Sequence, residues 1–340
     1  MTEVIIVKNE REAGDIYGRS VADLIKTKPN AVLGLATGSS PLAAYQSLAR
    51  IVHSEHIDVS QVRGFALDEY LGLPLDHPQS YHSTIHRTVV EPLGLNPDLV
   101  HVPGDVLDGA PLSDGERIAA AGPAYDKAIE EAGGIDVQIL GIGTDGHVGF
   151  NEPGSSFASG TRVKTLVEQT RIDNARFFDD DIDKVPTHCI TQGIGTILKA
   201  RHLVLLAFGS GKAEAVAETV EGGVSAFCPA SALQMHPHAT IIVDEEAASR
   251  LRHKDYYRYA YAHKPGLAAH LIAAPQSVSA SVRILPLAGT FWTFFGLPAG
   301  GFLHSLEGFG QYRGYLAVQI PPLTGGIGTL RWLLAGGFLH

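Results

Sequence analysis

The segment Leu140-Gly-Ile-Gly-Thr-Asp-Gly-His-Val-Gly-Phe-Asn-Glu-Pro153 carries the strongest chemical signal in the chain. Asp145, His147 and Glu152 lie close together in it, directly after an apolar run at residues 135–140 that indicates a buried strand. Glycines between them allow sharp backbone turns. An imidazole between two acids can be oriented by one and tuned by the other, as proton transfer near neutral pH requires. We therefore predict acid–base chemistry here.

A second candidate is the loop Thr37-Gly38-Ser39-Ser40-Pro41, between an apolar run and a helical pattern. Backbone N–H groups at a helix N-terminus, together with hydroxyl donors and a glycine, favour a phosphate group. The same residue types also make an ordinary strand-to-helix turn, so the loop by itself leaves both interpretations open. It is not the P-loop of nucleotide-binding enzymes, because no Gly-Lys-Ser/Thr follows.

Four charged residues elsewhere are further candidates. Asp68 and Glu69 follow the apolar run at 62–67; adjacent acids at a loop start are usually caps or surface groups, but the strand end favours a functional role for one of them. Arg176 and Lys212 are the candidate cations for an anionic ligand. Most single cations face solvent, yet Lys212 begins a helix after a glycine loop, where an anion is favoured.

The first 265 residues alternate strand and helix patterns. Strands are predicted at residues 4–7, 31–36, 62–67, 135–140, 202–207 and 239–243. Helices are predicted at 9–26, from Pro41 to about residue 53, at 113–132 and after residue 244, with Asn9 and Asp244 as the caps of the first and the last. This alternation predicts an α/β fold with a doubly wound, mostly parallel, Rossmann-like sheet and helices on both faces. Ligands bind such sheets at the carboxyl ends of the strands, where every candidate loop lies.

Four motifs together resemble the glucosamine-6-phosphate deaminase family: Leu35-Ala-Thr-Gly-Ser-Ser-Pro41, Phe65-Ala-Leu-Asp-Glu-Tyr70, Gly143-Thr-Asp-Gly-His-Val-Gly-Phe-Asn-Glu-Pro153 and Asn174-Ala-Arg-Phe-Phe178. They occur in the family's order, and the resemblance is colinear from about residue 2 to residue 260. It implies a doubly wound α/β enzyme that converts glucosamine 6-phosphate and water to fructose 6-phosphate and ammonia, with no metal or organic cofactor.

The resemblance also implies roles. Asp68 would be the base that moves the C2 proton to C1, and His147 would assist opening of the sugar ring, oriented and tuned by Asp145 and Glu152. The phosphate would be held by the loop at Thr37, Gly38, Ser39 and Ser40 and by Arg176 and Lys212. Because a base must be ionised, we expect local donors to keep Asp68 charged.

Allosteric control is a further implication of the resemblance. In some family members N-acetylglucosamine 6-phosphate activates by binding between subunits of an oligomer. Ser155, Arg162 and Lys164 match the family's activator-binding positions, whereas the usual tyrosine near residue 260 has no clean counterpart. We expect a homo-oligomer with a retained activator loop, and the sequence leaves activation itself open.

Composition excludes several classes of protein. The net charge is −10 and no Lys/Arg-rich run occurs, which argues against a nucleic-acid surface. Two cysteines without metal-ligand spacing, and no basic segment before the first strand, predict a cytoplasmic protein.

A 6-phosphogluconolactonase-like hydrolase and a non-enzymatic sugar-phosphate sensor are the alternatives to a deaminase. Phe150-Asn-Glu-Pro153 argues against the former, and the lack of a helix-turn-helix before residue 4 argues against the latter.

The chain changes character near residue 266. We predict a catalytic domain at residues 1–265 and an apolar Gly/Pro-rich extension at 266–340, whose only charged side chains are Arg283, Glu307, Arg313 and Arg331. Residues 284–303 carry no charge and are long enough to cross a bilayer of about 30 Å. Prolines and glycines there argue against both a stable helix and a sheet. A membrane anchor, a hydrophobic assembly segment and a stretch without selected structure are the alternatives, and we favour the last.

Overall fold

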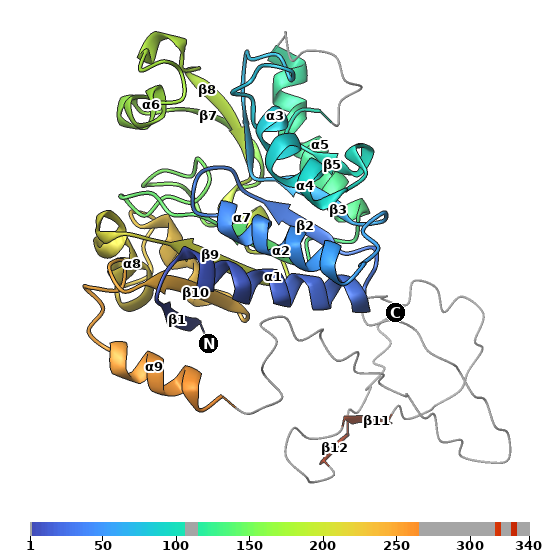
Figure 1. The fold of residues 1–340 in the computed structure, drawn as a ribbon, viewed down its shortest axis with the longest axis vertical. Coiled ribbons are helices and arrows are strands. Elements are labelled where there is room, and N and C mark those ends of the chain that lie inside the picture. Colours follow the sequence, from blue (N-terminus) through green and yellow to red (C-terminus); the bar gives the residue numbers. More distant parts are fainter. Residues whose placement is uncertain (1, 106–114, 265–316, 321–327, 332–340) are drawn as a thin grey trace, which may run out of the picture. The chain divides into compact units, whose positions relative to one another are not determined.

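The computed structural model describes residues 2–105, 115–264, 317–320 and 328–331 (Figure 1). The chain divides into two compact units, Met1–Ala274 and Pro275–His340. The first unit contains every residue that the sequence marked for chemistry. The predicted boundary at 265/266 lies at the edge of the described residues, and the predicted domain division stays a proposal.

The first unit is built on a seven-stranded sheet whose strands all run parallel. Their spatial order is β1 (Glu3–Val7), β10 (Ala239–Asp244), β9 (His202–Ala207), β6 (Val137–Leu140), β2 (Val32–Leu35), β3 (Arg63–Ala66) and β5 (Val100–His101). The central strands are apolar and fully buried, as expected for a sheet covered on both faces. The predicted doubly wound α/β fold is confirmed.

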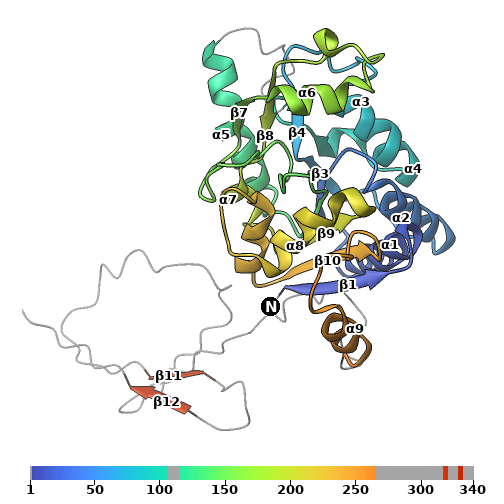
Figure 2. The same cartoon turned by 90° about the vertical axis from the view of Figure 1, so that its left-hand side faces the viewer.

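Helices cover both faces of this sheet (Figure 2). In that view α1 and α2 lie on one side of the sheet and α5 and α7 on the other. The helices are α1 (Glu10–Thr27), α2 (Leu42–Ser54), α3 (Tyr81–Ile85), α4 (Glu91–Leu93), α5 (Gly115–Glu131), α6 (Glu168–Ala175), α7 (Ile194–Ile197), α8 (Ala213–Glu221) and α9 (Lys254–Ala262). A π-helical turn at His86–Val90 joins α3 to α4.

Two predicted helix caps have different outcomes. The Asn9 side chain accepts a hydrogen bond from the Glu12 N–H at 3.0 Å, so the predicted start of α1 is confirmed. Asp244 was expected to cap a helix, but it caps only a turn. Its carboxylate accepts the N–H groups of Ala247 and Gly209, which joins the end of β10 to the loop after β9.

A second, antiparallel sheet lies beyond the end of β3. It consists of β4 (Asp68–Tyr70), β8 (His188–Thr191) and β7 (Arg162–Thr165) in that order. The chain leaves the parallel sheet at Leu67, whose N–H still bonds to Leu35, and its carbonyl accepts from Gln192. A small apolar cluster fills this region: Tyr70, Phe150, Leu166, Ala175, Phe178, Val185 and Cys189.

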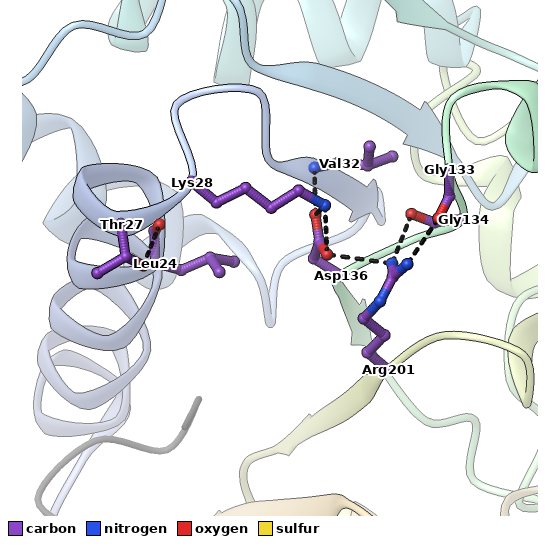
Figure 3. Close-up of polar contacts among 8 residues, drawn as sticks. All are labelled: Leu24, Thr27, Lys28, Val32, Gly133, Gly134, Asp136 and Arg201. Carbon is purple, nitrogen blue, oxygen red and sulfur yellow. Dashed lines mark hydrogen bonds and ion pairs between the residues drawn. The ribbon is translucent and has the colours of Figure 1, made fainter. Parts of the chain in front are cut away.

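A polar cluster ties the strands together at the amino edge of the parallel sheet (Figure 3). The Asp136 carboxylate, 6 % exposed, accepts from Nζ of Lys28 at 2.8 Å and from Nη1 of Arg201 at 3.1 Å. It also accepts from the Val32 N–H at 2.8 Å, at the start of β2. The cluster therefore joins α1, β2, β6 and β9 at the edge opposite to the candidate loops.

The second unit contains one described feature. Strands β11 (Ala317–Ile320) and β12 (Gly328–Arg331) pair antiparallel, so this part of the extension is regular where we expected no sheet. The apolar run at 284–303 lies outside the described residues. Within the part of the chain that the structure describes, no helix is long and apolar enough to cross a membrane.

Candidate active site

The candidate loops meet at one edge of the parallel sheet. Strands β9, β6, β2 and β3 are consecutive neighbours and run in the same direction, so their carboxyl ends lie side by side. These ends carry Lys212, the Asp145–His147 segment, the loop at 37–40 and Asp68, respectively. The topology therefore brings together residues that are up to 175 positions apart, as expected for a doubly wound sheet.

The loop at residues 37–40 has the properties of an anion site. Gly38 has φ +95°, a conformation that favours glycine, and a side chain there would point into open space. Among the described residues, the N–H groups of Gly38, Ser39 and Ser40 donate to no protein acceptor. No side chain caps α2, which follows directly. Free amides at a helix N-terminus favour an anion over an ordinary turn.

Two cations lie near this edge. Lys212 ends a short 3₁₀ turn after Gly209 and is half-buried. Burial lowers the pKa of Lys212, the negative charges of Asp145 and Asp173 oppose that shift, and the positive charge of Arg176 adds to it. The two cations thus act on each other electrostatically, although they come from different elements. Arg176 is exposed at the end of α6, with its guanidinium 4.7 Å from the ring centre of Phe177. An anion between them would relieve their repulsion.

Asp145 and His147 form a close pair. Nδ1 of His147 lies 2.7 Å from Oδ1 of Asp145, an ion-pair distance without the alignment of a hydrogen bond, and the same oxygen accepts the His147 N–H at 3.1 Å. The interaction with His147 lowers the pKa of Asp145 to about 2, so Asp145 is ionised at neutral pH. A side chain on Gly143 would overlap the imidazole. The structure thus places Asp145 beside the imidazole, and the orienting role assigned to Asp145 stays a prediction.

Glu152 is placed differently from the prediction. Its buried carboxylate accepts from Oγ1 of Thr170 at 2.9 Å and from the Val167 N–H at 3.3 Å, at the start of α6. Glu152 makes no described hydrogen bond to His147. In this structure the imidazole of His147 therefore has one acid beside it, Asp145. Glu152 instead holds the site loop to α6. The loop sequence could not show this, because α6 lies some fifteen residues further along the chain.

Asp68 is the buried acid of the site, at 6 % exposure. The expectation that local donors keep it charged is wrong, since no described residue donates a hydrogen bond to its carboxylate. Burial, and to a smaller extent the neighbouring charge of Glu69, together raise the pKa of Asp68 to about 8. An acid of this kind is a strong base once it has lost its proton.

Several residues around Asp68 were not selected from the sequence. Glu69 was a candidate beside Asp68 but received no role of its own, yet its carboxylate accepts three backbone N–H groups, those of Tyr70, Tyr81 and His82. The Asn174 side chain donates to the Tyr70 hydroxyl at 2.9 Å. Tyr70 and Asn174 stood within recognised motifs, but Tyr81 carried no signal, because a tyrosine in an isolated short segment usually only packs.

The predicted activator residues are only partly together. Arg162 and Lys164 alternate along β7 and are half-buried, and both influence the thiol of Cys189 electrostatically. Nη1 of Arg162 donates to Oδ1 of Asn151 at 2.7 Å. The Ser155 hydroxyl is buried and donates to the Glu152 carbonyl at 2.7 Å. Arg162 and Ser155 thus support the loop that carries Glu152.

Comparison with known proteins agrees with this fold. Residues 10–242 match the family model described as glucosamine-6-phosphate isomerases/6-phosphogluconolactonase. A glucosamine-6-phosphate deaminase of Bifidobacterium longum strain DJO10A is 86 % identical over 265 residues, which cover 78 % of this chain and 98 % of that protein. A glucosamine-6-phosphate deaminase of Streptomyces coelicolor is 58 % identical over 263 residues, 77 % of this chain and 98 % of that protein. The chain belongs to the glucosamine-6-phosphate isomerase/6-phosphogluconolactonase family.

Solved structures give the same result. A monomeric glucosamine-6-phosphate deaminase superposes with a TM-score of 0.68 at 42 % identity, covering 73 % of this chain and 100 % of that one. A 6-phosphogluconolactonase from Trypanosoma cruzi superposes with a TM-score of 0.58 at 20 % identity, covering 74 % and 97 %, and supports the fold alone.

Proposed function

We propose that this chain is a glucosamine-6-phosphate deaminase, which converts glucosamine 6-phosphate and water to fructose 6-phosphate and ammonia. The observation that carries the proposal is the position of Asp68. A buried, strongly basic carboxylate lies at the same sheet edge as an anion loop, two cations and an oriented imidazole. Relatives that match this chain over nearly their whole length carry the same activity in their names.

The chemistry follows from these positions. The free N–H groups at residues 38–40, with Thr37, Arg176 and Lys212, hold the phosphate and so fix the sugar. His147, oriented by Asp145, assists proton transfer as the ring opens to the aldehyde. Asp68 then takes the proton from C2 and returns it to C1. The aldehyde at C1 thereby becomes an alcohol, and the amine at C2 becomes an imine. Water adds at C2 and ammonia leaves.

Several finer assignments belong to the same proposal. The net reaction consumes water and cleaves a carbon–nitrogen bond, so the enzyme is an isomerising hydrolase of amino-sugar metabolism. We place it in N-acetylglucosamine catabolism in the cytoplasm, as a homo-oligomer. Residues 1–265 form its catalytic domain. Ser155, Arg162 and Lys164 belong to an activator site for N-acetylglucosamine 6-phosphate. Sigmoidal kinetics relieved by that sugar would support this site, and hyperbolic kinetics at every activator level would contradict it.

The test measures ammonia release and fructose 6-phosphate formation in parallel, on the full chain and on residues 1–265. Equal amounts of both products from both proteins are expected, because the relatives consist almost entirely of the matching 265 residues. Activity in the full chain alone would show that the extension completes the enzyme. No activity in either, with both folded, would contradict the proposed function and favour a lactonase or a sugar-phosphate sensor.

A further inference from the structure

Two tyrosine hydroxyls connect the segments that are proposed to bind phosphate. The Tyr81 hydroxyl donates to the Tyr70 hydroxyl at 3.4 Å, and the Thr37 side chain acts on the same Tyr81 hydroxyl, lowering its pKa against the larger effect of burial. On the other side, the Asn174 amide donates to the Tyr70 hydroxyl at 2.9 Å. Hydrogen bonds therefore join Tyr81, Tyr70 and Asn174, and the Thr37 side chain lies at the Tyr81 end of this chain. We refer to these four side chains as the tyrosine bridge.

The two ends of the tyrosine bridge lie in segments that are proposed to bind phosphate. Thr37 begins the loop that follows β2 and offers free N–H groups. Asn174 lies in α6, two residues before Arg176. These two segments are 137 residues apart in the chain, and α6 is connected to the small antiparallel sheet rather than to the parallel one. The tyrosine bridge thus links an amide donor loop to the segment that carries a guanidinium.

Tyr81 is itself held from three directions. Its N–H donates at 2.9 Å to the Glu69 carboxylate, next to Asp68. Its ring is stacked on Phe150, with the planes 5° apart and the ring centres at 6.0 Å, and its contact with the Tyr70 ring is closer, at 4.8 Å. Phe150 belongs to the loop that contains His147. Because Tyr81 is fixed in this way, its hydroxyl has little freedom to move and can hold the segments on either side of it at a set spacing.

Both phenols stay protonated, as the bridge requires. Burial raises the pKa of Tyr70 to about 12 and raises the pKa of Tyr81 well above its ordinary range. A neutral hydroxyl can donate one hydrogen bond and accept others, so each tyrosine can bond to two neighbours at once. A pair of neutral hydroxyls also adds no negative charge beside an anion site.

We propose that Tyr81, acting with Tyr70, is a positioning residue that sets the spacing between the Thr37 loop and the Arg176 end of α6 so that both contact one phosphate group. This inference rests on the proposed function and extends it, because it assigns phosphate affinity to a residue that touches no charged group of the sugar. It predicts an effect on phosphate binding with little effect on the chemical step.

The experiment compares Tyr81→Phe with Tyr17→Phe in the full-length protein. Tyr17 is a matched control, because it is a buried tyrosine between α1 and α2 whose hydroxyl has no described partner. In Tyr81→Phe the KM for glucosamine 6-phosphate should rise about fivefold, as for one neutral hydrogen bond, with kcat within about twofold. The Kd of inorganic phosphate should rise by a similar factor. Tyr17→Phe should change neither.

A double-mutant cycle tests the connection to Thr37. Thr37→Val and Tyr81→Phe should each weaken phosphate binding, and together they should weaken it by less than the product of the two factors, because both remove the same contact. Unchanged KM and phosphate Kd in Tyr81→Phe would overturn the proposal. A loss of kcat at constant KM would do so as well, because it would place Tyr81 in the chemical step.

Failure of the proposed function can be told apart from failure of the positioning role of Tyr81. If the wild-type protein binds phosphate but releases no ammonia, the deaminase assignment fails, while the Kd of phosphate in Tyr81→Phe still decides the positioning role. If the protein deaminates the sugar but binds free phosphate too weakly to measure, the change in KM decides it. If neither binding nor activity is found, both proposals are wrong.

Discussion

Gly149 lies directly against the carboxylate of Asp68. A Cβ atom on Gly149 would be 3.2 Å from Oδ2 of Asp68 and 3.0 Å from Oγ1 of Thr191. Gly149 also has φ +56°, in the left-handed region. The glycine therefore makes room for the proposed base in a loop whose other residues supply the imidazole.

Gly149→Ala should lower kcat/KM for glucosamine 6-phosphate by about tenfold or more, because a misplaced base loses much of its effect. Gly154→Ala is the matched control, since Gly154 has φ +89° but a Cβ atom on it would meet no other atom within 4 Å. Both variants bear backbone strain of about 1 kcal/mol, and only Gly149→Ala crowds Asp68. Equal activity in the two variants would show that the crowding is harmless.

Asp68→Asn should lower the rate of deamination by about a hundredfold or more, the usual contribution of a general base, and should leave the Kd of inorganic phosphate nearly unchanged. Unchanged turnover would exclude Asp68 as the base.

The same variant should be more stable than the wild type at pH 8. Asp68 has its pKa raised from 3.8 to about 8 in the folded protein, so the folded state keeps a proton that the unfolded chain releases. The wild type therefore loses stability as the pH rises from about 4 to about 8, and Asp68→Asn removes that loss. We expect a gain of at least about 1 kcal/mol at pH 8 and little gain at pH 4, measured by urea unfolding.

Glu69→Gln should shift the pH dependence of kcat/KM. Asp68 must be ionised to accept a proton, so activity should fall as the pH drops below its pKa of about 8 in the free enzyme. Glu69 is a second cause of that raised pKa, so its neutralisation should move the acid limb to lower pH. The substrate titrates equally in both assays and cancels in the comparison. Glu130→Gln, at an exposed acid, is the control, and coincident profiles for all three proteins would contradict this coupling.

Lys212→Ala should raise the KM for glucosamine 6-phosphate by about tenfold or more, the cost of a lost charged hydrogen bond. Lys199→Ala removes a lysine of the same charge from an exposed pair with Glu130 and should leave KM unchanged. Measuring both at two salt concentrations separates a local contact from a general field effect, because only the general effect is strongly screened. Equal shifts in KM would count against a phosphate contact by Lys212.

Asp136→Asn should destabilise the fold by about 2 kcal/mol without changing KM. Its carboxylate is buried and pairs with Lys28 and Arg201, so neutralising it leaves two cations close together. Those cations are partly exposed, which limits the cost. Glu214→Gln removes an exposed pair with Arg250 and should cost less than about 1 kcal/mol. A large change in KM in Asp136→Asn would show that the two edges of the sheet are coupled.

The local sequence was sufficient for the fold class and for the residues that end the strands. Continuous apolar runs such as 202–207 and 135–140 indicate buried parallel strands, and the capping pattern at Asn9 locates the start of α1, because these signals depend on neighbours within one turn or strand. The parallel direction then places the loops at one edge. This much follows from periodicity and chain direction.

Only the tertiary structure decided how the side chains of those loops are partnered. Glu152 bonds to Thr170 rather than to His147, and Asp68 is buried without a described hydrogen-bond donor to its carboxylate. Tyr81 reaches Thr37 and Tyr70 from a five-residue helix that carries no signal of its own. Residue type and spacing specify which groups can do chemistry. Partners, burial and pKa depend on which segments the fold brings together, because the electric field at a carboxylate is set by everything packed around it.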